Sequence, residues 1–238
     1  MTYHEQSQRV AVITGASQGL GAAMARELDQ RGWTVVLDAR DAARLAESVQ
    51  GLAHAHAMPG DVTDAGHRAA LAARAAELGG ASLLVNNSST LGASPQPTVA
   101  DLAPEVVETV FRTNLHAPVE LVRALLPQLR ANGGTVLNVS SDASVEGYPG
   151  WGAYGASKAA LDQLSRVLAA EEPDLRVYAV DPGDMRTQMH QDAFPGDDIS
   201  DRPPPEDVVP NLVALLASDL PSGRYRAAEI AVPAGAGR

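Results

Sequence analysis

Eight residues near the start of the chain read Thr14-Gly15-Ala16-Ser17-Gln18-Gly19-Leu20-Gly21. They follow the apolar run 10–13, which has the pattern of a buried strand, and they open the helical stretch 22–30. A strand, a glycine-rich turn and a helix N-terminus together form a cradle for phosphate, because backbone N–H groups and the helix dipole face the anion. Gly15 allows the tight turn, Gly19 lets the backbone approach a pyrophosphate, and Gly21 permits close helix packing. The stretch therefore predicts a phosphate-binding turn in an α/β fold.

Beyond this turn, short apolar runs alternate with amphipathic stretches along the chain. The runs that we expect to form strands lie near residues 9–14, 33–38, 53–57, 81–86, 134–140, 175–181 and 228–232. Such alternation predicts a parallel sheet covered on both faces by helices, with right-handed crossovers. No internal repeat, low-complexity tail or interdomain linker divides the 238 residues, so we expect residues 1–238 to form one doubly wound domain of the α/β class.

Composition excludes several classes of protein. The chain has 29 Asp and Glu against 18 Lys and Arg, and the net charge of −11 argues against nucleic acid or an anionic membrane as a partner. Because there is no cysteine, neither a disulfide framework nor thiol catalysis is available. No apolar run reaches the ~18 residues of a membrane span and residues 1–9 are polar, which favours a cytoplasmic location. His54 and His56 share one face of a predicted strand, but without a third ligand nearby we expect no metal site.

The middle of the chain carries a second motif, Tyr154-Gly155-Ala156-Ser157-Lys158, preceded by Ser141. Tyr154 and Lys158 share one face of a predicted helix over 153–170. Ser141 follows the apolar run 134–139, so its hydroxyl would emerge at the carboxyl end of a buried strand. A ketone that receives a hydride becomes an alkoxide and needs a proton, and an ammonium beside a phenol lowers the phenol's pKa from its usual value of about 10. The three side chains together therefore predict hydride chemistry at a carbonyl.

Taken together, these motifs resemble the short-chain dehydrogenase/reductase family over nearly the whole chain. In that family the glycine pattern is T-G-x-x-x-G-x-G, which residues 14–21 match at every fixed position. The resemblance implies a Rossmann-type sheet of seven strands in the order 3-2-1-4-5-6-7. It implies that Tyr154 is the general acid/base, that Lys158 holds the nicotinamide ribose and tunes Tyr154, and that Ser141 orients the substrate oxygen. It also implies that Asn114, in a helix, anchors a water that leads protons to the lysine.

The resemblance further implies a set of cofactor contacts. These are Gly15, Ser17, Gln18, Gly19, Leu20, Gly21, Arg40, Asp61, Val62, Asn87, Ser88, Tyr154, Lys158, Pro182, Gly183 and Thr187. Within the set, Asp61 and Val62 match the pair beside adenine, and the Pro-Gly pair and Thr187 match the segment that touches the nicotinamide amide. For Asp61, capping of the helix that begins near Asp64 is an equal alternative.

Two departures from the family pattern concern details. Ser88-Ser89 replaces the usual Ala-Gly, which adds side chains where the backbone normally approaches the cofactor. The segment 227–235 lacks the common Gly-Gly after the last strand, which puts the usual tetramer in doubt. From the resemblance we expect a homodimer or homotetramer in which helices within 101–130 and 152–170 form a two-fold interface.

The choice between NADP and NAD depends on the end of the second strand, where Asp38, Ala39 and Arg40 follow one another. An acidic residue there usually accepts from the ribose 2′-hydroxyl of NAD. Family members that use NAD carry their aspartate at the place of Ala39, whereas Arg40 falls where members that use NADP carry a basic residue. Asp38 would repel a 2′-phosphate, and Gln18 stands where a second basic residue is common. NADP(H) is favoured over NAD(H), with both kept open.

The substrate is expected to be a small carbonyl compound or alcohol. Residues 184–207, rich in proline and aspartate, form a long connection that we interpret as a substrate lid, with a plain acidic surface loop as the alternative. Apolar side chains in the segments that the family folds around the substrate hint at an apolar or aromatic ketone; they are Leu91, Tyr148, Trp151, Met185, Met189 and Phe194. Three hypotheses follow: an NADP(H)-dependent carbonyl reductase, an NAD-dependent alcohol dehydrogenase, and a non-catalytic cofactor-sensing scaffold.

Overall fold

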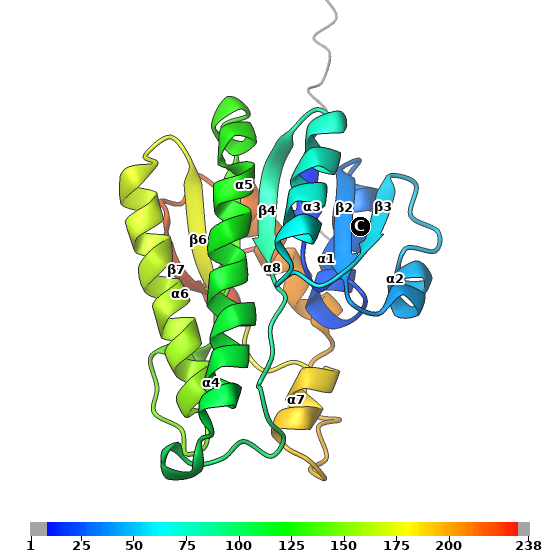
Figure 1. Ribbon diagram of the computed structural model, residues 1–238. Coiled ribbons are helices and arrows are strands. Elements are labelled where there is room, and N and C mark those ends of the chain that lie inside the picture. Colours follow the sequence, from blue (N-terminus) through cyan, green and yellow to red (C-terminus); the bar gives the residue numbers. More distant parts are fainter. Residues whose placement is uncertain (1–8, 233–238) are drawn as a thin grey trace, which may run out of the picture.

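The apolar runs form a parallel sheet in the computed structural model, which describes residues 9–232 (Figure 1). Its strands are β1 (Val10–Ile13), β2 (Thr34–Ala39), β3 (Ala55–Pro59), β4 (Ala81–Asn86), β5 (Thr135–Val139), β6 (Arg176–Asp181) and β7 (Gly223–Arg226). They lie in the order β3-β2-β1-β4-β5-β6-β7, and every neighbouring pair is parallel. The predicted α/β class and strand order are confirmed.

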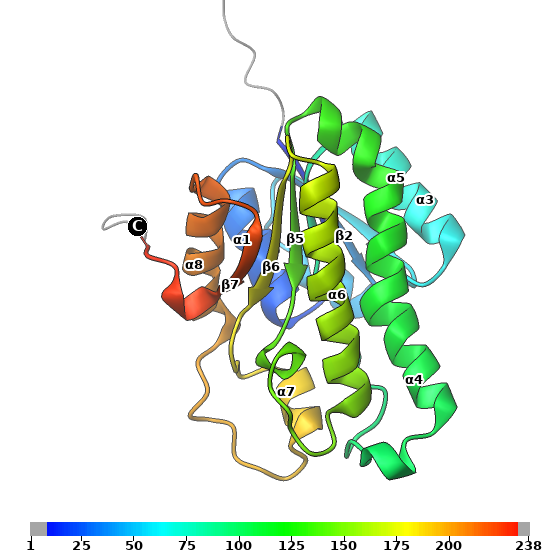
Figure 2. The same ribbon diagram turned by 90° about the vertical axis from the view of Figure 1, so that its left-hand side faces the viewer.

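Helices cover both faces of this sheet, as Figure 2 shows. They are α1 (Gly19–Gln30), α2 (Ala42–Ser48), α3 (Ala65–Glu77), α4 (Pro104–Phe111), α5 (Ala117–Ala131), α6 (Gly152–Glu171), α7 (Gln188–Ala193) and α8 (Pro205–Ala217). Helices α1 and α8 pack against each other on one face, while α3, α5 and α6 lie on the other (Figure 2). Because both faces are covered, the inner strands are continuous apolar runs; every residue of β1 is buried.

Two apolar cores separate along the alternation of the strands. In β1, Ala11 and Ile13 face the core under α1 and α8, and Val10 and Val12 face the core under α3 and α5. This is the period-two pattern of a strand that is buried on both sides. The two cores fix the strands rigidly, so the loops at their carboxyl ends start from defined positions.

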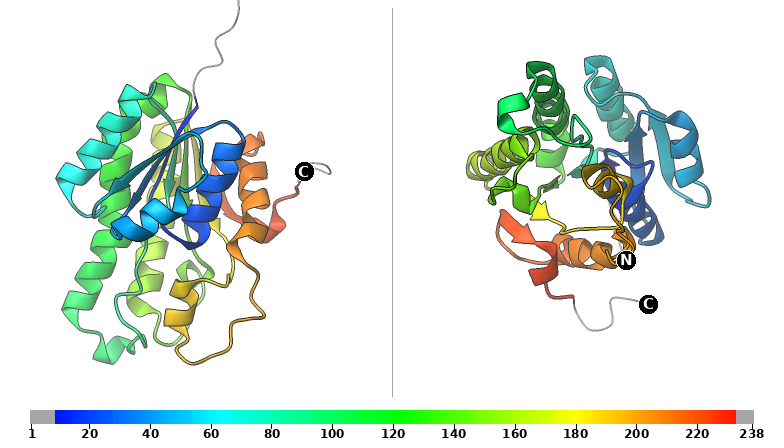
Figure 3. Two further views of the ribbon diagram at one scale, coloured as in Figure 1. Left: turned by 90° about the vertical axis from the view of Figure 1, so that its right-hand side faces the viewer. Right: turned by 90° about the horizontal axis from the view of Figure 1, so that it is seen from below.

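The carboxyl ends of the strands meet at the lower end of the molecule in Figure 1, where the segment after β6 crosses them. Seen from below, α7 lies near the middle of that end (Figure 3). The predicted lid segment 184–207 is partly helical, since it contains α7. Thr187 caps this helix: its Oγ1 accepts a hydrogen bond from the His190 backbone N–H at 3.2 Å. Its last residues, from Pro205, already belong to α8.

The seventh strand was predicted at the wrong place. It is formed by Gly223–Arg226 and not by residues 228–232; Ala227–Glu229 form a 3₁₀ turn that overlaps the start of that predicted strand. The strand is polar because it lies at the sheet edge, where Arg224 and Arg226 each reach Asp181 of β6 at 3.7 Å. Ile230 of the predicted strand is buried, but in the core beside α8. The prediction followed the apolar run 228–232. The strand is instead the polar segment just before it, whose two arginines pair with Asp181 of the neighbouring strand.

Smaller differences concern boundaries. Asn114 lies in a π-helical turn, Arg112–His116, between α4 and α5, rather than in a regular helix. The third strand ends at Pro59, two residues later than predicted. Within residues 9–232, no helix has both the length and the apolar character needed to cross a membrane. Residues 1–8 and 233–238, which include part of the C-terminal segment that lacks Gly-Gly, lie outside the described residues.

Candidate active site

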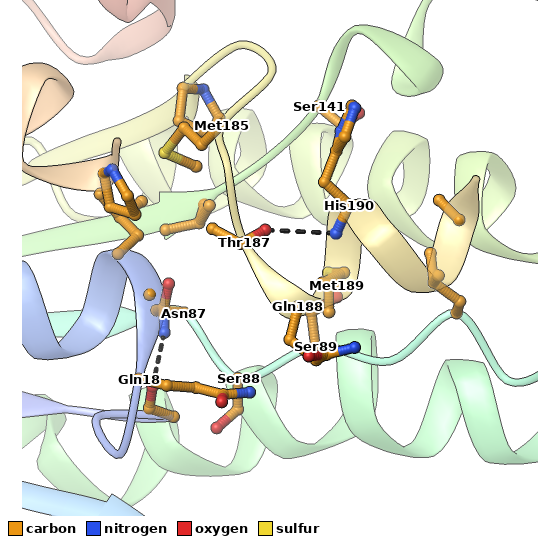
Figure 4. Close-up of a pocket in the computed structure, with 18 of the residues that line it drawn as sticks. Gln18, Asn87, Ser88, Ser89, Ser141, Met185, Thr187, Gln188, Met189 and His190 are labelled. Carbon is orange, nitrogen blue, oxygen red and sulfur yellow. Dashed lines mark hydrogen bonds between the residues drawn. The ribbon is translucent and has the colours of Figure 1, made fainter. Parts of the chain in front are cut away.

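A cleft of about 910 Å³ opens at the carboxyl ends of the strands. All the predicted catalytic and cofactor-binding residues line it except Gly21 and Asn114, which lie just behind its wall. Figure 4 shows its two sides: Gln18, Asn87 and Ser88 lie opposite the segment that carries Thr187 and His190. Residues from distant parts of the sequence thus meet at one site, as predicted for the edge where parallel strands end.

The glycine turn is held tightly against the segment after β4. Gly15 has φ +66°, a conformation that side chains rarely adopt. A Cβ on Gly21 would lie 2.4 Å from the Gly15 carbonyl oxygen, so only glycine lets α1 start this close to the turn. Asn87, predicted as a cofactor contact, holds the turn itself: its Nδ2 donates to the carbonyl oxygens of Thr14 at 2.8 Å and Gly15 at 3.1 Å.

The N-terminus of α1 suits an anion. No side chain caps it, and no acidic residue lies in its first turn, so its free N–H groups and dipole meet no local negative charge. Gly19 has φ +58°, and a Cβ added to it would point toward Thr187 and lie 3.5 Å from the Thr187 Cγ2 atom. The gap between the glycine turn and Thr187 thus stays open, and these residues fit the pyrophosphate of a dinucleotide.

Tyr154 lies in the first turn of α6 and is 7% exposed. It packs with Leu91 and Ala143, and its ring meets the Trp151 ring edge-on at a centroid distance of 5.4 Å. Burial raises the pKa of Tyr154 to about 12, although the hydroxyls of Ser141 and Ser89 act in the opposite direction. This differs from the expected lowering by Lys158. The phenol is therefore protonated at neutral pH, which is the form that a proton donor needs.

Lys158 is buried as well. It is 2% exposed, and burial lowers the pKa of its ammonium to about 8, although Asp162 acts in the opposite direction. The ammonium is thus mostly charged at neutral pH and loses its charge in the mildly alkaline range. Its Nζ donates to the Val139 carbonyl oxygen at 2.7 Å and lies 5.5 Å from the centroid of the Tyr154 ring. The two side chains are neighbours as predicted, and burial is the largest cause of the pKa shift of each.

Ser141 lies two residues after the end of β5, at the carboxyl end of a buried strand as predicted. Its Oγ accepts a hydrogen bond from the Ala143 N–H at 3.2 Å and donates to Asp142 Oδ1 at 3.0 Å. Its carbonyl oxygen accepts from Arg224 Nη2 at 3.0 Å. Ser140, between β5 and Ser141, has a buried hydroxyl that makes no hydrogen bond among the described residues. Backbone and side chain thus hold Ser141 at the mouth of the cleft.

Asn114 is buried and links the loop after β4 to α6. Its Oδ1 accepts from the Thr90 N–H at 2.8 Å, and its Nδ2 donates to the Thr90 carbonyl oxygen at 3.0 Å and to Ser157 Oγ at 3.1 Å. Ser157 precedes Lys158 in the chain. Asn114 therefore lies beside the Tyr154–Lys158 helix without lining the cleft, and its predicted water-anchoring role stays a prediction.

Asp38, the acidic residue at the end of β2, is 1% exposed and already engaged. Its Oδ1 accepts from the Gly15 N–H at 3.1 Å, and its Oδ2 lies 3.3 Å from His67 Nε2. A Cβ on Gly60 would lie 2.3 Å from His67 Nδ1, so the glycine gives the imidazole its place against Asp38. Asp38 thus stabilises the glycine turn. The His67 imidazole lies beside the Asp38 carboxylate, whose negative charge would repel a 2′-phosphate.

Two arginines line the same end of the cleft. Arg40 was predicted there, but Arg44, in the first turns of α2, was not. Arg44 Nη1 donates to Gln18 Oε1 at 3.2 Å, so it brings a positive charge to the position where Gln18 replaces a common basic residue. The feature of the sequence that could have indicated Arg44 is its position four residues after Arg40, near the start of the next helix.

Asp61 does not cap a helix. Its Oδ1 accepts from the Thr63 N–H at 2.8 Å, whereas Asp64 caps α3 by accepting from the His67 N–H at 2.7 Å. Although burial acts to raise it, the pKa of Asp61 is lowered by the hydrogen bonds from Thr63 and by the nearby Arg40. The capping alternative for Asp61 is thus wrong, and its carboxylate lines the cleft near Arg40.

The apolar residues suggested for the substrate lie at the other end. Leu91, Trp151, Met185 and Met189 line the cleft, while Phe194 ends α7 and its ring lies 6.0 Å from that of Trp151. Within residues 9–232 no group of three or more His, Asp or Glu side chains is arranged to hold a metal ion. His56 Nδ1 instead lies 3.0 Å from Arg74 Nη2.

Comparisons with known proteins agree with this geometry. Residues 9–198 match the family model described as short chain dehydrogenase. The chain is 35% identical to sepiapterin reductase of Xenopus laevis over 202 residues, which are 76% of this chain and 75% of that protein. It superimposes with a TM-score of 0.85 on a short chain dehydrogenase of Salmonella enterica serovar Typhi, at 29% identity and covering 93% of this chain and 96% of that one.

A second similar structure carries a nicotinamide cofactor analogue. It is an alcohol dehydrogenase of Thermococcus sibiricus in complex with 5-hydroxy-NADP, with a TM-score of 0.81, 26% identity and coverage of 92% of this chain and 95% of that one. Fold, glycine turn and family match point the same way. The chain belongs to the short-chain dehydrogenase family of NAD(P)-dependent oxidoreductases.

Proposed function

We propose that this protein is an NADP(H)-dependent carbonyl reductase in which Tyr154 is the general acid. The observation that carries the proposal is the meeting of Ser141, Tyr154 and Lys158 at one end of a cleft whose other end holds Arg40 and Arg44. The three groups at the first end suit proton transfer to a carbonyl oxygen. The two guanidinium groups at the other end suit a 2′-phosphate.

The residues fit the cofactor in the following way. The glycine turn and the N-terminus of α1 would hold the pyrophosphate, Asp61 and Val62 would flank the adenine, and Thr187 would face the nicotinamide amide. When bound, the cofactor supplies the hydride that goes to the carbonyl carbon. Because Asp38 is occupied by the Gly15 N–H and by His67, it is a weak candidate for the ribose 2′-hydroxyl, which favours NADP over NAD.

The chain's own residues then handle the proton. Ser141 positions the carbonyl oxygen by donating a hydrogen bond, and the Tyr154 phenol, protonated at neutral pH, gives its proton to the same oxygen as the alkoxide develops. The phenolate left behind is stabilised by the Lys158 ammonium. Asn114, through Ser157, keeps the helix that carries both groups in place. The carbonyl thus gains one hydride and one proton and becomes an alcohol.

An NAD-dependent alcohol dehydrogenase with the same catalytic residues is the second candidate. The observation that favours it is the carboxylate of Asp38 beside Arg40 at the ribose end. A non-catalytic cofactor-sensing scaffold is the third candidate. A buried tyrosine beside a lysine whose pKa is lowered to about 8 argues against it, because such a scaffold does not require groups for proton transfer.

A panel of ketones, aldehydes and quinones, with oxidation of NADPH and of NADH followed in parallel, separates the three. The reductase proposal predicts turnover with NADPH at a kcat/KM at least about tenfold above that with NADH. A preference for NADH would support the alcohol dehydrogenase. Binding of cofactor with no turnover of any carbonyl would support the scaffold.

A further inference from the structure

The substrate end of the cleft holds a carboxylate whose hydrogen-bond partners are all neutral. Asp142 lines the cleft directly after Ser141. Its Oδ1 accepts from Ser141 Oγ at 3.0 Å and from the Ala143 N–H at 2.8 Å. Its Oδ2 accepts from the Tyr148 hydroxyl at 2.9 Å. Because each carboxylate oxygen accepts about two hydrogen bonds, Oδ2 has room for a further donor.

The other carboxylates at this end already have cationic partners. Asp181 lies 3.7 Å from both Arg224 and Arg226, and Asp184 lies 3.7 Å from Arg202 and from His190. Among residues 9–232, Asp142 has no Lys, Arg or His nitrogen within 4.0 Å. A charged group beside the reacting centre without such a partner is suited to a cation that comes with the substrate.

An aromatic wall stands next to this carboxylate. Trp151 is its centre, with the Tyr148 ring at a centroid distance of 6.4 Å, Tyr154 at 5.4 Å and Phe194 at 6.0 Å. Aromatic faces attract ammonium groups, and clusters of aromatic rings bind quaternary nitrogen in proteins. The wall and Asp142 therefore select the same chemistry: an apolar body that carries a positive charge.

We propose that the substrates of this enzyme are ketones with a positively charged nitrogen close to the carbonyl, that is, amino ketones. This inference depends on the proposed carbonyl reductase function. Ser141 Oγ, which would touch the carbonyl oxygen, lies 3.0 Å from Asp142 Oδ1. Since an ammonium contacts a carboxylate within about 4 Å, a nitrogen two or three bonds from the carbonyl carbon can reach this carboxylate.

The same contact links recognition to reaction. Ser141 has one hydroxyl proton, and Asp142 accepts it. As long as that proton points to Asp142, it is not available to the carbonyl oxygen. A cation that engages Asp142 weakens this hydrogen bond and releases the proton toward the carbonyl. The charge on the substrate is therefore expected to raise kcat as well as to lower KM.

Two ketones of nearly identical shape test the proposal. Phenacyl trimethylammonium carries a permanent charge, and 3,3-dimethyl-1-phenylbutan-1-one has carbon in place of the nitrogen. With NADPH, we expect the wild type to reduce the cationic ketone with kcat/KM about tenfold or more above the neutral one. Asp142→Asn keeps the shape of the side chain without its charge, and it should bring the ratio below about twofold.

Asp184→Asn is the matched control, because it removes one charge from the same cleft but from a carboxylate that has cationic partners. It should keep the preference for the cationic ketone. Equal loss of preference in Asp142→Asn and Asp184→Asn would overturn the proposal, because a diffuse negative potential would then explain it. Equal rates for the two ketones in the wild type would overturn it while leaving the reductase function intact. Turnover of neither ketone, nor of any other carbonyl, would instead reject the reductase function.

Discussion

At the scale of single residues, we propose that two arginines that line the cleft determine how the protein distinguishes NADPH from NADH. Arg40 and Arg44 both line the cleft, and Arg44 is tied to Gln18. Guanidinium groups bind phosphate through charge-assisted hydrogen bonds. We therefore expect Arg40→Ala and Arg44→Ala each to raise KM for NADPH about tenfold and KM for NADH less than about twofold.

Steady-state kinetics with each cofactor measure this difference. Arg123→Ala, on the exposed side of α5 with 81% of its side chain accessible, is the control for the loss of a positive charge and should change neither KM. Equal increases in KM for NADPH and NADH in the Arg40 variant would contradict the assignment to the 2′-phosphate.

The pKa values of the buried pair predict a pH profile. Tyr154, with a pKa raised to about 12, stays protonated through the neutral and mildly alkaline range, whereas Lys158, with a pKa lowered to about 8, loses its charge there. The phenolate that forms during reduction then lacks its cationic neighbour. We expect kcat for carbonyl reduction at saturating NADPH to be nearly flat up to the pKa of Lys158, about 8, and to fall above it as the ammonium loses its proton.

Lys158→Met should lower kcat and abolish this alkaline fall, because the titrating group is gone. Rates measured from pH 6 to 10 in the wild type and the variant decide the point. An unchanged fall near pH 8 in Lys158→Met would assign the ionisation to another group.

How far single residues were predictable depends on the range of the forces involved. The spacing of Tyr154 and Lys158 and the position of Ser141 after a buried run are local, so the sequence predicted their meeting in the cleft. The pKa of Tyr154 depends on burial by Leu91, Ala143 and neighbours distant in sequence, and here the prediction was wrong in direction. Arg44 was overlooked because its contact with Gln18 depends on how α2 packs beside the glycine turn.

At the scale of elements, the seventh strand depends on one arginine. Arg224 donates from Nε to Asp162 Oδ2 at 3.0 Å and from Nη2 to the Ser141 carbonyl oxygen at 3.0 Å, and it lies 3.7 Å from Asp181. Asp162 is 3% exposed. Removal of the cation would leave the buried Asp162 without a cationic partner and would leave Asp181 with Arg226 alone.

We expect Arg224→Met to lower the free energy of unfolding by about 3–5 kcal/mol, as measured by urea denaturation. Arg226→Met is the control, because Arg226 pairs with the same Asp181 but half of its side chain is exposed, and we expect it to cost less than about 1 kcal/mol. Similar small losses in both variants would show that the network does not hold the strand.

This network also explains which elements the sequence predicted. Strands β1, β2, β4, β5 and β6 are apolar runs buried between helices, so their pattern alone located them to within a few residues. Strand β3, at the opposite edge of the sheet from β7, is only partly buried, and its predicted bounds were two residues too early. The seventh is a polar edge strand held by ion pairs to Asp162 and Asp181. Such ion pairs produce no periodic pattern of apolar residues by which the sequence could have indicated the strand. Helix α7 within the predicted lid depends on a single capping residue, Thr187, which the proline-rich composition obscured.

At the scale of the whole molecule, the strand order followed from family resemblance and not from the residues alone, because periodicity gives the elements without their arrangement. Assembly stays a prediction from the same source. Helices α5 and α6 each expose apolar side chains, Val119 on α5 and Leu164 and Val167 on α6, each 38% accessible. An exposed apolar surface on two neighbouring helices suits a two-fold interface.

We therefore expect gel filtration with light scattering to give a mass of at least twice the 24.7 kDa of one chain. The double variant Leu164→Glu and Val167→Glu should shift the protein toward the monomer by placing charges in the apolar contact. A wild type that elutes only at the mass of one chain would rule out the interface.

The proposed mechanism depends on proton donation by Tyr154 during NADPH-dependent reduction of a carbonyl. The most direct test compares kcat for one accepted ketone in the wild type and Tyr154→Phe at saturating NADPH, with NADPH affinity measured separately by fluorescence. We predict a fall in kcat of about 10²–10⁴-fold, with the dissociation constant for NADPH changed less than about threefold. A variant that reduces the ketone at close to the wild-type rate would contradict the account.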